Sequence, residues 1–121
     1  MSGATVEKSL IPEDPEDLKL ITLARATLGR TGAAQGACVR DTEGRAYAAA
    51  SVHLEHLRLS AIAVAVAMVV SSRAGGLEAV ALVGEEGPSA DDLEIVRDLS
   101  GDGVTVWWAD PHGAVRSATE L

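Results

Sequence analysis

The sequence predicts a small α/β fold, and three observations lead to this prediction. The 121 residues are 47% hydrophobic but include no Phe, two Trp and one Tyr, so the core must consist of aliphatic side chains. Segments with helical periodicity are separated by short β-branched runs. A chain of this length can bury roughly two thirds of its unfolded surface around one core. We therefore expect a single domain over residues 1–121, with residues 1–12 loosely ordered.

The first expected element is a helix that begins at Asp14 and Pro15. An Asp at this position accepts hydrogen bonds from unpaired amides, and Pro suits the first helical position. Arg25 and Arg30 lie toward the expected C-terminus and Gly29 near the expected end, because glycine is common where helices stop. The apolar stripe of this helix comprises Leu18, Leu20, Ile21, Ala24 and Leu28.

A β-hairpin and a second helix are expected next. Residues 35–40 and 45–51 are apolar segments that flank the turn sequence DTEG at 41–44. Residues 53–58 are polar and predict a solvated loop. From residue 59 to about 72 the chain is apolar on nearly every face, which indicates a buried helix ended by Gly75 and Gly76. Its longest apolar run, residues 61–70, has about half the length needed to cross a bilayer.

The last part of the chain predicts a βαβ unit and a final strand. Residues 77–83 and 104–109 have the composition of interior strands, and residues 90–99 between them form a short helix. Ser89 and Asp92 at the start of this helix are spaced as a capping box. A turn at residues 110–113 precedes a brief strand at 114–117.

Charge and cysteine content exclude several classes of function. The net charge of −8 repels phosphate backbones, and few aromatic side chains are available to stack on bases, so we expect no nucleic-acid partner. The single Cys38 cannot form an internal disulfide and is expected to be a small buried hydrophobe. The chain opens without a signal-peptide pattern, so we expect a cytoplasmic location and no membrane partner.

Several segments resemble the cytidine deaminases. QGACV at 35–39 and EGRAY at 43–47 are similar to the family's opening hairpin, VGAALL followed by a turn and DGRIY. The family stretch NVENASYGLTICAE lies without a gap over residues 51–64, and Pro-Cys-x-x-Cys lies over residues 88–92. The resemblance implies a three-layer α/β/α cytidine-deaminase-like fold with a mixed five-stranded sheet. It also implies a homodimer or homotetramer.

The same resemblance shows where the catalytic groups would stand. The first zinc-ligating Cys of the family falls on Ile62, the proton-transferring Glu on Val64, and the paired Cys ligands on Ser89 and Asp92. Deamination needs a metal-bound water with a lowered pKa and a carboxyl group that carries protons. Ile62 and Val64 provide neither, so we expect no catalytic residue, no zinc site and no cofactor.

The substrate-binding positions of the family have changed as well. Its sugar-binding Asn and Glu fall on Ser51 and His53, and its base-stacking Phe falls on Ala33. A small-molecule sensor that keeps the old pocket for a nucleoside or base is one hypothesis. Its candidate ligand pocket consists of Ser51, His53, Arg58 and Asp92.

The leading hypothesis is a catalytically inactive, oligomeric protein that acts as a binding or regulatory module. The alternative is a zinc-dependent nucleoside deaminase with an atypical metal site formed by His53, His56 and Asp92. His53 and Glu55 do match the His-x-Glu of other zinc deaminases. However, they lie about nine residues before Ile62, outside the expected ligand helix, which favours a solvated loop.

Overall fold

The computed structural model describes residues 11–121, and within them the main sheet has five strands. These are β1 (Gln35–Asp41), β2 (Ala46–Ala50), β5 (Leu77–Gly84), β6 (Ser100–Ala109) and β7 (Val115–Glu120). Their order is β2-β1-β5-β6-β7, with β5 and β6 parallel and the other neighbours antiparallel. The expected mixed five-stranded sheet is confirmed. The prediction of loose order for residues 1–12 falls mainly on residues 1–10, outside the described range.

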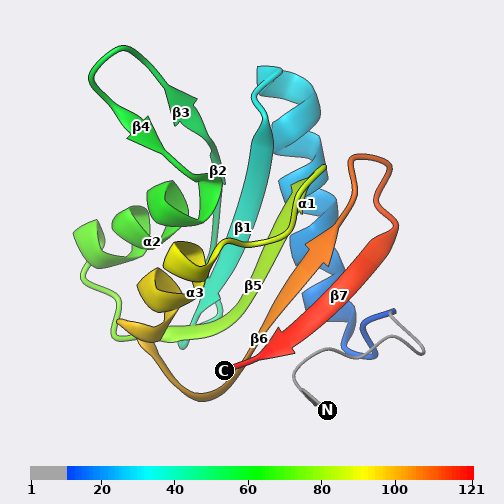
Figure 1. Ribbon diagram of the computed structural model, residues 1–121. Helices are drawn as coiled ribbons and strands as arrows, with labels where there is room; N and C mark the ends of the chain where they lie inside the picture. Colours follow the sequence, from blue (N-terminus) through cyan, green and yellow to red (C-terminus); the bar gives the residue numbers. More distant parts are fainter. Residues whose placement is uncertain (1–10) are drawn as a thin grey trace.

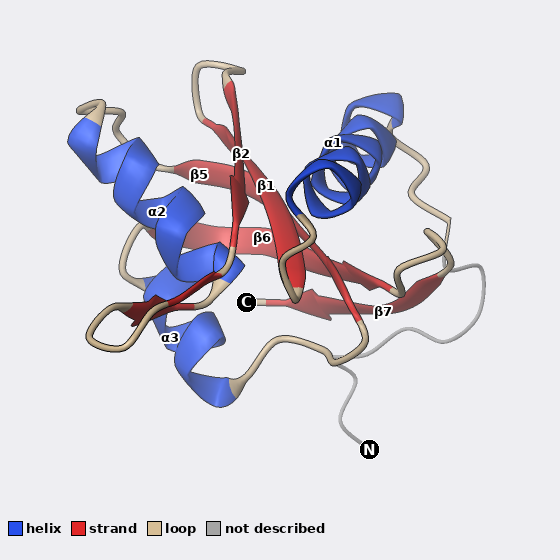
Figure 2. Ribbon diagram, turned by 90° about the horizontal axis from the view of Figure 1, so that it is seen from above, coloured by secondary structure: helices blue, strands red, loops and turns tan. Residues whose placement is uncertain are grey.

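Helices cover both faces of this sheet (Figures 1 and 2). Helix α1 (Pro15–Thr31) lies on one face, and α2 (Ala61–Ser71) and α3 (Ala90–Arg97) lie together on the other. A small hairpin of β3 (Val52–His53) and β4 (Arg58–Leu59) projects beside α2 (Figure 1). The expected three-layer α/β/α arrangement is therefore confirmed.

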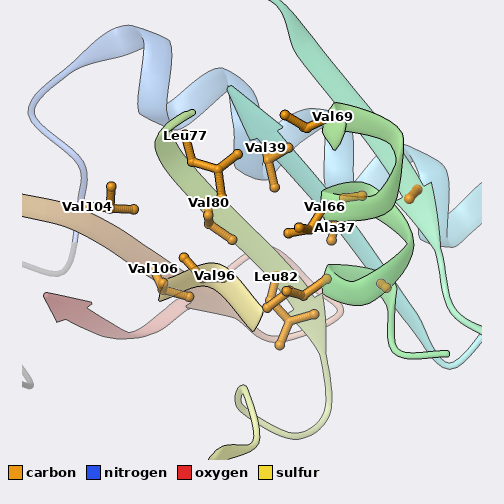
Figure 3. Packing of buried hydrophobic residues seen from close by; sticks show 14 residues of the cluster. Ala37, Val39, Val66, Val69, Leu77, Val80, Leu82, Val96, Val104 and Val106 are labelled. Atoms are coloured by element: carbon orange, nitrogen blue, oxygen red, sulfur yellow. The ribbon is translucent and has the colours of Figure 1, made fainter. Parts of the chain in front are cut away.

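Alternation along the strands divides the aliphatic core between the two faces. On β5, Val80 and Leu82 face α2 and α3, whereas Ala81 and Val83 face α1. Figure 3 shows the larger cluster, in which valines of α2 and α3 meet those of the strands. Cys38 lies fully buried in the smaller cluster, and burial raises the pKa of its thiol to about 11. Its expected role as a buried hydrophobe is confirmed.

Helix α1 begins at the expected residues and ends close to the expected position. The carboxylate of Asp14 accepts a hydrogen bond from the amide of Glu16 at 2.9 Å, and Pro15 is the first helical residue. The last helical residue is Thr31 and the C-cap is Gly32, with φ of 68°, so Gly29 lies near the end of the helix as expected. Gly32 takes the left-handed conformation typical of a helix end, and its amide donates to the Leu28 carbonyl. Leu18 is exposed and does not belong to the buried stripe.

The β1–β2 hairpin is organised by a buried carboxylate. Asp41 accepts hydrogen bonds from the amides of Glu43 and Arg45 at 2.8 and 3.0 Å and from the Tyr47 hydroxyl at 2.7 Å. Burial alone would raise the pKa of Asp41, but the bonds from Tyr47 and the two amides outweigh it and hold the pKa below its ordinary value. The expected hairpin is confirmed, with Gly44 in its turn at φ of 87°.

Three expected elements differ in detail. Residues 53–58 belong to the β3–β4 hairpin, because Val52 pairs with Leu59 and His53 with Arg58, so the prediction of a simple loop is wrong. Helix α2 is not buried on all sides, since Met68 and Val70 are exposed. Helix α3 ends at Arg97 and β6 starts at Ser100, both earlier than expected. The register between β5 and β6 shifts so that Leu77 pairs with Ser100 and Ala79 pairs with Thr105.

Candidate functional site

The positions singled out by the family resemblance meet where β1 begins, β2 ends and α2 starts. Gln35 is the first residue of β1, and its backbone amide donates to the Ser51 hydroxyl at 3.0 Å. Its side-chain oxygen accepts a hydrogen bond from the amide of Ala61 at 3.1 Å. Gln35 therefore connects the sheet to the first turn of α2. The sequence did not predict this role, because no local pattern indicates which distant amide a glutamine at the start of a strand will contact.

The start of α3 lies against the start of α2 through hydrogen-bonded side chains. Ser89 and Asp92 form the capping box expected from the sequence, with Ser89 Oγ accepting from the Asp92 amide at 3.0 Å and Asp92 Oδ2 accepting from the Ser89 amide at 3.1 Å. The hydroxyl of Ser60, the N-cap of α2, donates to Asp92 Oδ1 at 2.6 Å. Asp92 is only 3% exposed, so its carboxylate is buried, and both of its oxygens accept hydrogen bonds.

A hollow of about 300 Å³ opens beside this junction. Three of the four candidate pocket residues, Ser51, His53 and Arg58, line it together. Asp92 does not line the hollow but bonds to Ser60, which does. The structure thus brings the four positions into one neighbourhood, and their role in binding stays a prediction. The complete lining is Ala34, Gln35, Ser51, Val52, His53, Arg58, Leu59 and Ser60.

Two further hollows continue along the same edge of the sheet. One of about 510 Å³ is lined by Ala33, Ala34 and Gln35 on one side and by Glu85 and Glu86 after β5 on the other. The second, of about 720 Å³, shares Glu85 and lies beside the β6–β7 turn. Both hollows lie at the carboxyl ends of the parallel strands β5 and β6, the edge at which open α/β sheets bind ligands.

Asp110, in the turn beside the second hollow, serves that turn itself. Its carboxylate accepts from the amides of Ala114 and His112, at 3.1 and 2.9 Å, and from the guanidinium of Arg116. The bond from the Ala114 amide is the main cause that lowers the pKa of Asp110, and the contacts with His112 and Arg116 outweigh the opposing effect of burial. Asp110 therefore has a structural role in the turn.

The residues at the family's zinc-ligand positions do not fit a zinc ion. Ile62 is fully buried in the core and offers no donor atom. Ser89 and Asp92 are engaged in capping, and a single carboxylate does not make a tight zinc site. His56 is exposed on the β3–β4 hairpin, whereas Asp92 is buried. Across residues 11–121, no three His, Cys, Asp or Glu side chains are grouped so that they could hold a metal ion.

Comparison with known proteins agrees with this architecture. The protein-family model described as "Cytidine deaminase-like" matches residues 13–113. The cytidine deaminase of Burkholderia pseudomallei superimposes with a TM-score of 0.73 at 19% identity, covering 84% of this chain and 90% of that one. For the Mycobacterium tuberculosis enzyme the TM-score is 0.65 at 21% identity, with coverages of 81% and 86%.

The cytidine deaminase of Mycobacterium leprae is similar to the same degree, with a TM-score of 0.65 at 19% identity over 82% of this chain and 90% of that one. Curated protein sequences contain no match to this chain. Identities at this level establish the fold, and the expected cytidine-deaminase-like fold is confirmed. No helix in the described part of the chain is long and apolar enough to cross a membrane.

Proposed function

Because this chain belongs to the cytidine deaminase-like family, we propose that it is a catalytically inactive member that serves as an oligomeric binding or regulatory module. The observation that carries this proposal is the chemistry of two α2 residues. Ile62 and Val64 stand at the positions of the family's first zinc-ligating Cys and proton-transferring Glu, and neither side chain can donate or accept a hydrogen bond.

The packing of these two residues supports the proposal. Ile62 is fully buried in the cluster between the sheet and α2, and Val64 is partly buried against the same cluster. A fully buried aliphatic side chain contributes about 1.5 to 3 kcal/mol to stability. Replacing Ile62 with Cys and Val64 with Glu would remove aliphatic groups from the core. We infer that these two positions contribute to the stability of the fold rather than to catalysis.

Catalytic inactivity is tested with cytidine itself. We expect no uridine from cytidine or deoxycytidine, whether the purified chain is treated with EDTA or supplied with zinc, and elemental analysis should find far less than one zinc per chain. Zinc-dependent turnover would contradict the proposal and favour the atypical metal site instead. In that case His53→Ala and Asp92→Ala should abolish both zinc binding and turnover.

A binding role is supported by the hollow beside β3 and β4, where His53 and Arg58 offer polar groups to a nucleoside or base. In the same assay series, thermal unfolding is measured with a panel of nucleosides and bases. A ligand at a hundred times its dissociation constant stabilises the folded state by about 2.7 kcal/mol. The shift should disappear in Arg58→Ala and persist in Arg30→Ala, a matched exposed arginine on α1. A panel without any shift removes the nucleoside hypothesis.

Self-association is supported by the outer face of α2. No charged residue occurs from Ala61 to Ser71, yet Met68 and Val70 are exposed, as is Leu57 on the neighbouring β3–β4 hairpin. Met68 and Val70 lie on the two flanks of the exposed side of α2, and exposed apolar side chains bordering an uncharged surface are typical of protein interfaces. The proposed occupant is a second copy of the chain, in a homodimer or homotetramer.

The α2 face is tested by introducing charge. At micromolar concentration we expect light scattering to give a dimeric or tetrameric mass for the wild type and a monomeric mass for Met68→Glu/Val70→Glu, because burying two carboxylates in an interface is costly. Leu23→Glu is the matched control, since Leu23 is 42% exposed on α1, across the sheet. A monomeric wild type would exclude this assembly.

A further inference from the structure

The starts of α2 and α3 lie side by side on one face of the sheet (Figures 1 and 2). Each helix begins with a serine N-cap, Ser60 for α2 and Ser89 for α3. Asp92 contacts both caps, because Oδ2 accepts from the Ser89 amide and Oδ1 accepts from the Ser60 hydroxyl. The two helix starts are therefore joined through a single carboxylate.

The bond between Ser60 and Asp92 is short and protected. Its length of 2.6 Å is typical of a hydroxyl that donates to a carboxylate. The same hydroxyl accepts from the Ala63 amide at 3.1 Å, so the two hydrogen bonds polarise each other. Because Asp92 is 3% exposed, water cannot readily replace Ser60, and loss of this partner would leave a buried acceptor atom unpaired.

Helix electrostatics favour an acidic group at this junction. The amino-terminal end of a helix carries a partial positive charge, and Asp92 lies where two such ends meet. Gln35 adds its side-chain oxygen on the α2 side by accepting from the Ala61 amide. The side chains of Gln35, Ser60 and Ser89 thus place oxygen atoms on the Ala61, Ala63 and Asp92 amides at the starts of both helices.

The family's zinc ligands would span the same two helices. Their positions fall on Ile62 in α2 and on Ser89 and Asp92 at the start of α3, so a metal held there would connect the helix starts. The side chains present cannot do this, because Ile62 has no donor atom. We propose that the Ser60–Asp92 hydrogen bond performs this connecting role instead and makes the junction of α2 and α3 independent of metal. The proposal goes beyond catalytic inactivity, since a chain can lose activity without gaining such a bond.

A double-mutant cycle measures the proposed connection. Urea unfolding is compared for the wild type, Ser60→Ala, Asp92→Ala and the double variant. Each single change also removes a helix cap, but the coupling term isolates the pair. We expect a coupling of at least about tenfold in the unfolding equilibrium constant, or about 1.4 kcal/mol. The proposal would be overturned if the unfolding equilibrium constant of the double variant changed by the product of the two single changes, because the coupling would then be zero.

A matched cycle controls for capping alone. Asp14 caps α1 on the opposite face of the sheet, so Ser60→Ala and Asp14→Ala should act independently. The change in the unfolding equilibrium constant of this double variant should equal the product of the two single changes within about twofold. Equal coupling in both cycles would mean that the first coupling is not specific to the junction, and would likewise overturn the proposal.

Hydrogen exchange keeps the proposal testable if Asp92→Ala does not fold. In Ser60→Ala, amide exchange should accelerate in the first turn of α3, to which Ser60 is hydrogen-bonded through Asp92. Ser72→Ala is the matched control, because its hydroxyl donates to the Met68 carbonyl at the other end of α2. Unchanged exchange in α3 of the Ser60 variant would show that Ser60 caps its own helix and nothing more.

Metal independence is measured on the wild type. The midpoint of thermal unfolding should be the same in EDTA and in excess zinc. An increase with zinc that is lost in Asp92→Asn would identify Asp92 as a metal ligand and overturn the proposal. The coupling and exchange results concern only the junction, whereas the cytidine assay concerns only catalysis, so the two proposals can fail separately.

Discussion

Gly36→Val is expected to lower the free energy of unfolding by about 3 kcal/mol or more, the upper end of the range for substitutions that overfill a packed core. A Cβ atom on Gly36 would lie 2.2 Å from the carbonyl oxygen of Ala24 and 3.1 Å from the amide nitrogen of Leu28. Both atoms belong to the backbone of α1, so no side chain can rotate away and the helix must move off β1. Since small domains are stable by only about 5 to 15 kcal/mol, this loss is a large part of the total.

Urea unfolding of Gly36→Ala and Gly36→Val measures this effect, with Gly29→Ala as the matched control. A Cβ on Gly29 would meet nothing within 4 Å, and this residue lies within α1. Alanine there should stabilise the protein by about 0.5 to 1 kcal/mol, because glycine is unfavourable inside a helix. A neutral Gly36→Ala variant would show that α1 does not approach β1 as closely as described.

Asp41→Ala is the second change with a large expected effect. It removes the acceptor of three hydrogen bonds, from the Tyr47 hydroxyl and the amides of Glu43 and Arg45. The side chain is fully buried, so water cannot restore these bonds without opening the hairpin. We expect the midpoint of thermal unfolding to fall by roughly 10 °C or more, the scale at which loss of a buried network acts in a domain of this size.

The pH dependence of stability gives a second measurement on Asp41. Its pKa in the folded state lies below the ordinary value of 3.8, because the hydrogen bonds outweigh the effect of burial. The contribution of Asp41 is therefore complete above pH 3.8 and is lost as the pH falls through the folded pKa. The difference in unfolding midpoint between wild type and Asp41→Asn should shrink in that acidic range.

Asp98→Asn is the control for this profile, because Asp98 is exposed at the end of α3 and its side chain has no assigned role. Its profile should follow that of the wild type. A difference between wild type and Asp41→Asn that stays constant through the acidic range would contradict the assigned network around Asp41.

Local signals explain what could be predicted from the sequence. Asp14 and Pro15 marked the start of α1, and Ser89 and Asp92 marked the capping box, because the groups that satisfy a helix start lie within three residues of each other. The hairpin turn, the βαβ unit and the aliphatic core followed from turn residues and periodicity. Residue identity at position 62 was enough to show that this side chain cannot bind a metal ion.

Contacts between distant segments explain what could not be predicted. The β3–β4 hairpin is a two-residue pairing that leaves almost no alternation to detect. The apolar composition of α2 is compatible with a helix buried on all sides and with a helix buried on one side. Only the packing of the helix in the structure shows that Met68 is exposed. Gln35 was missed because its partner, the Ala61 amide, is 26 residues away.

By itself, the sequence determined the family resemblance, the order of elements and the absence of Cys, His, Asp and Glu from α2, because each depends on neighbouring residues or on side-chain type alone. Only the tertiary structure decided that Gly36 lies against the backbone of α1 and that Ser60 bonds to Asp92, 32 residues away. Such contacts depend on how the helices pack against the sheet. That packing is determined by the sum of many contacts, which no local sequence pattern encodes.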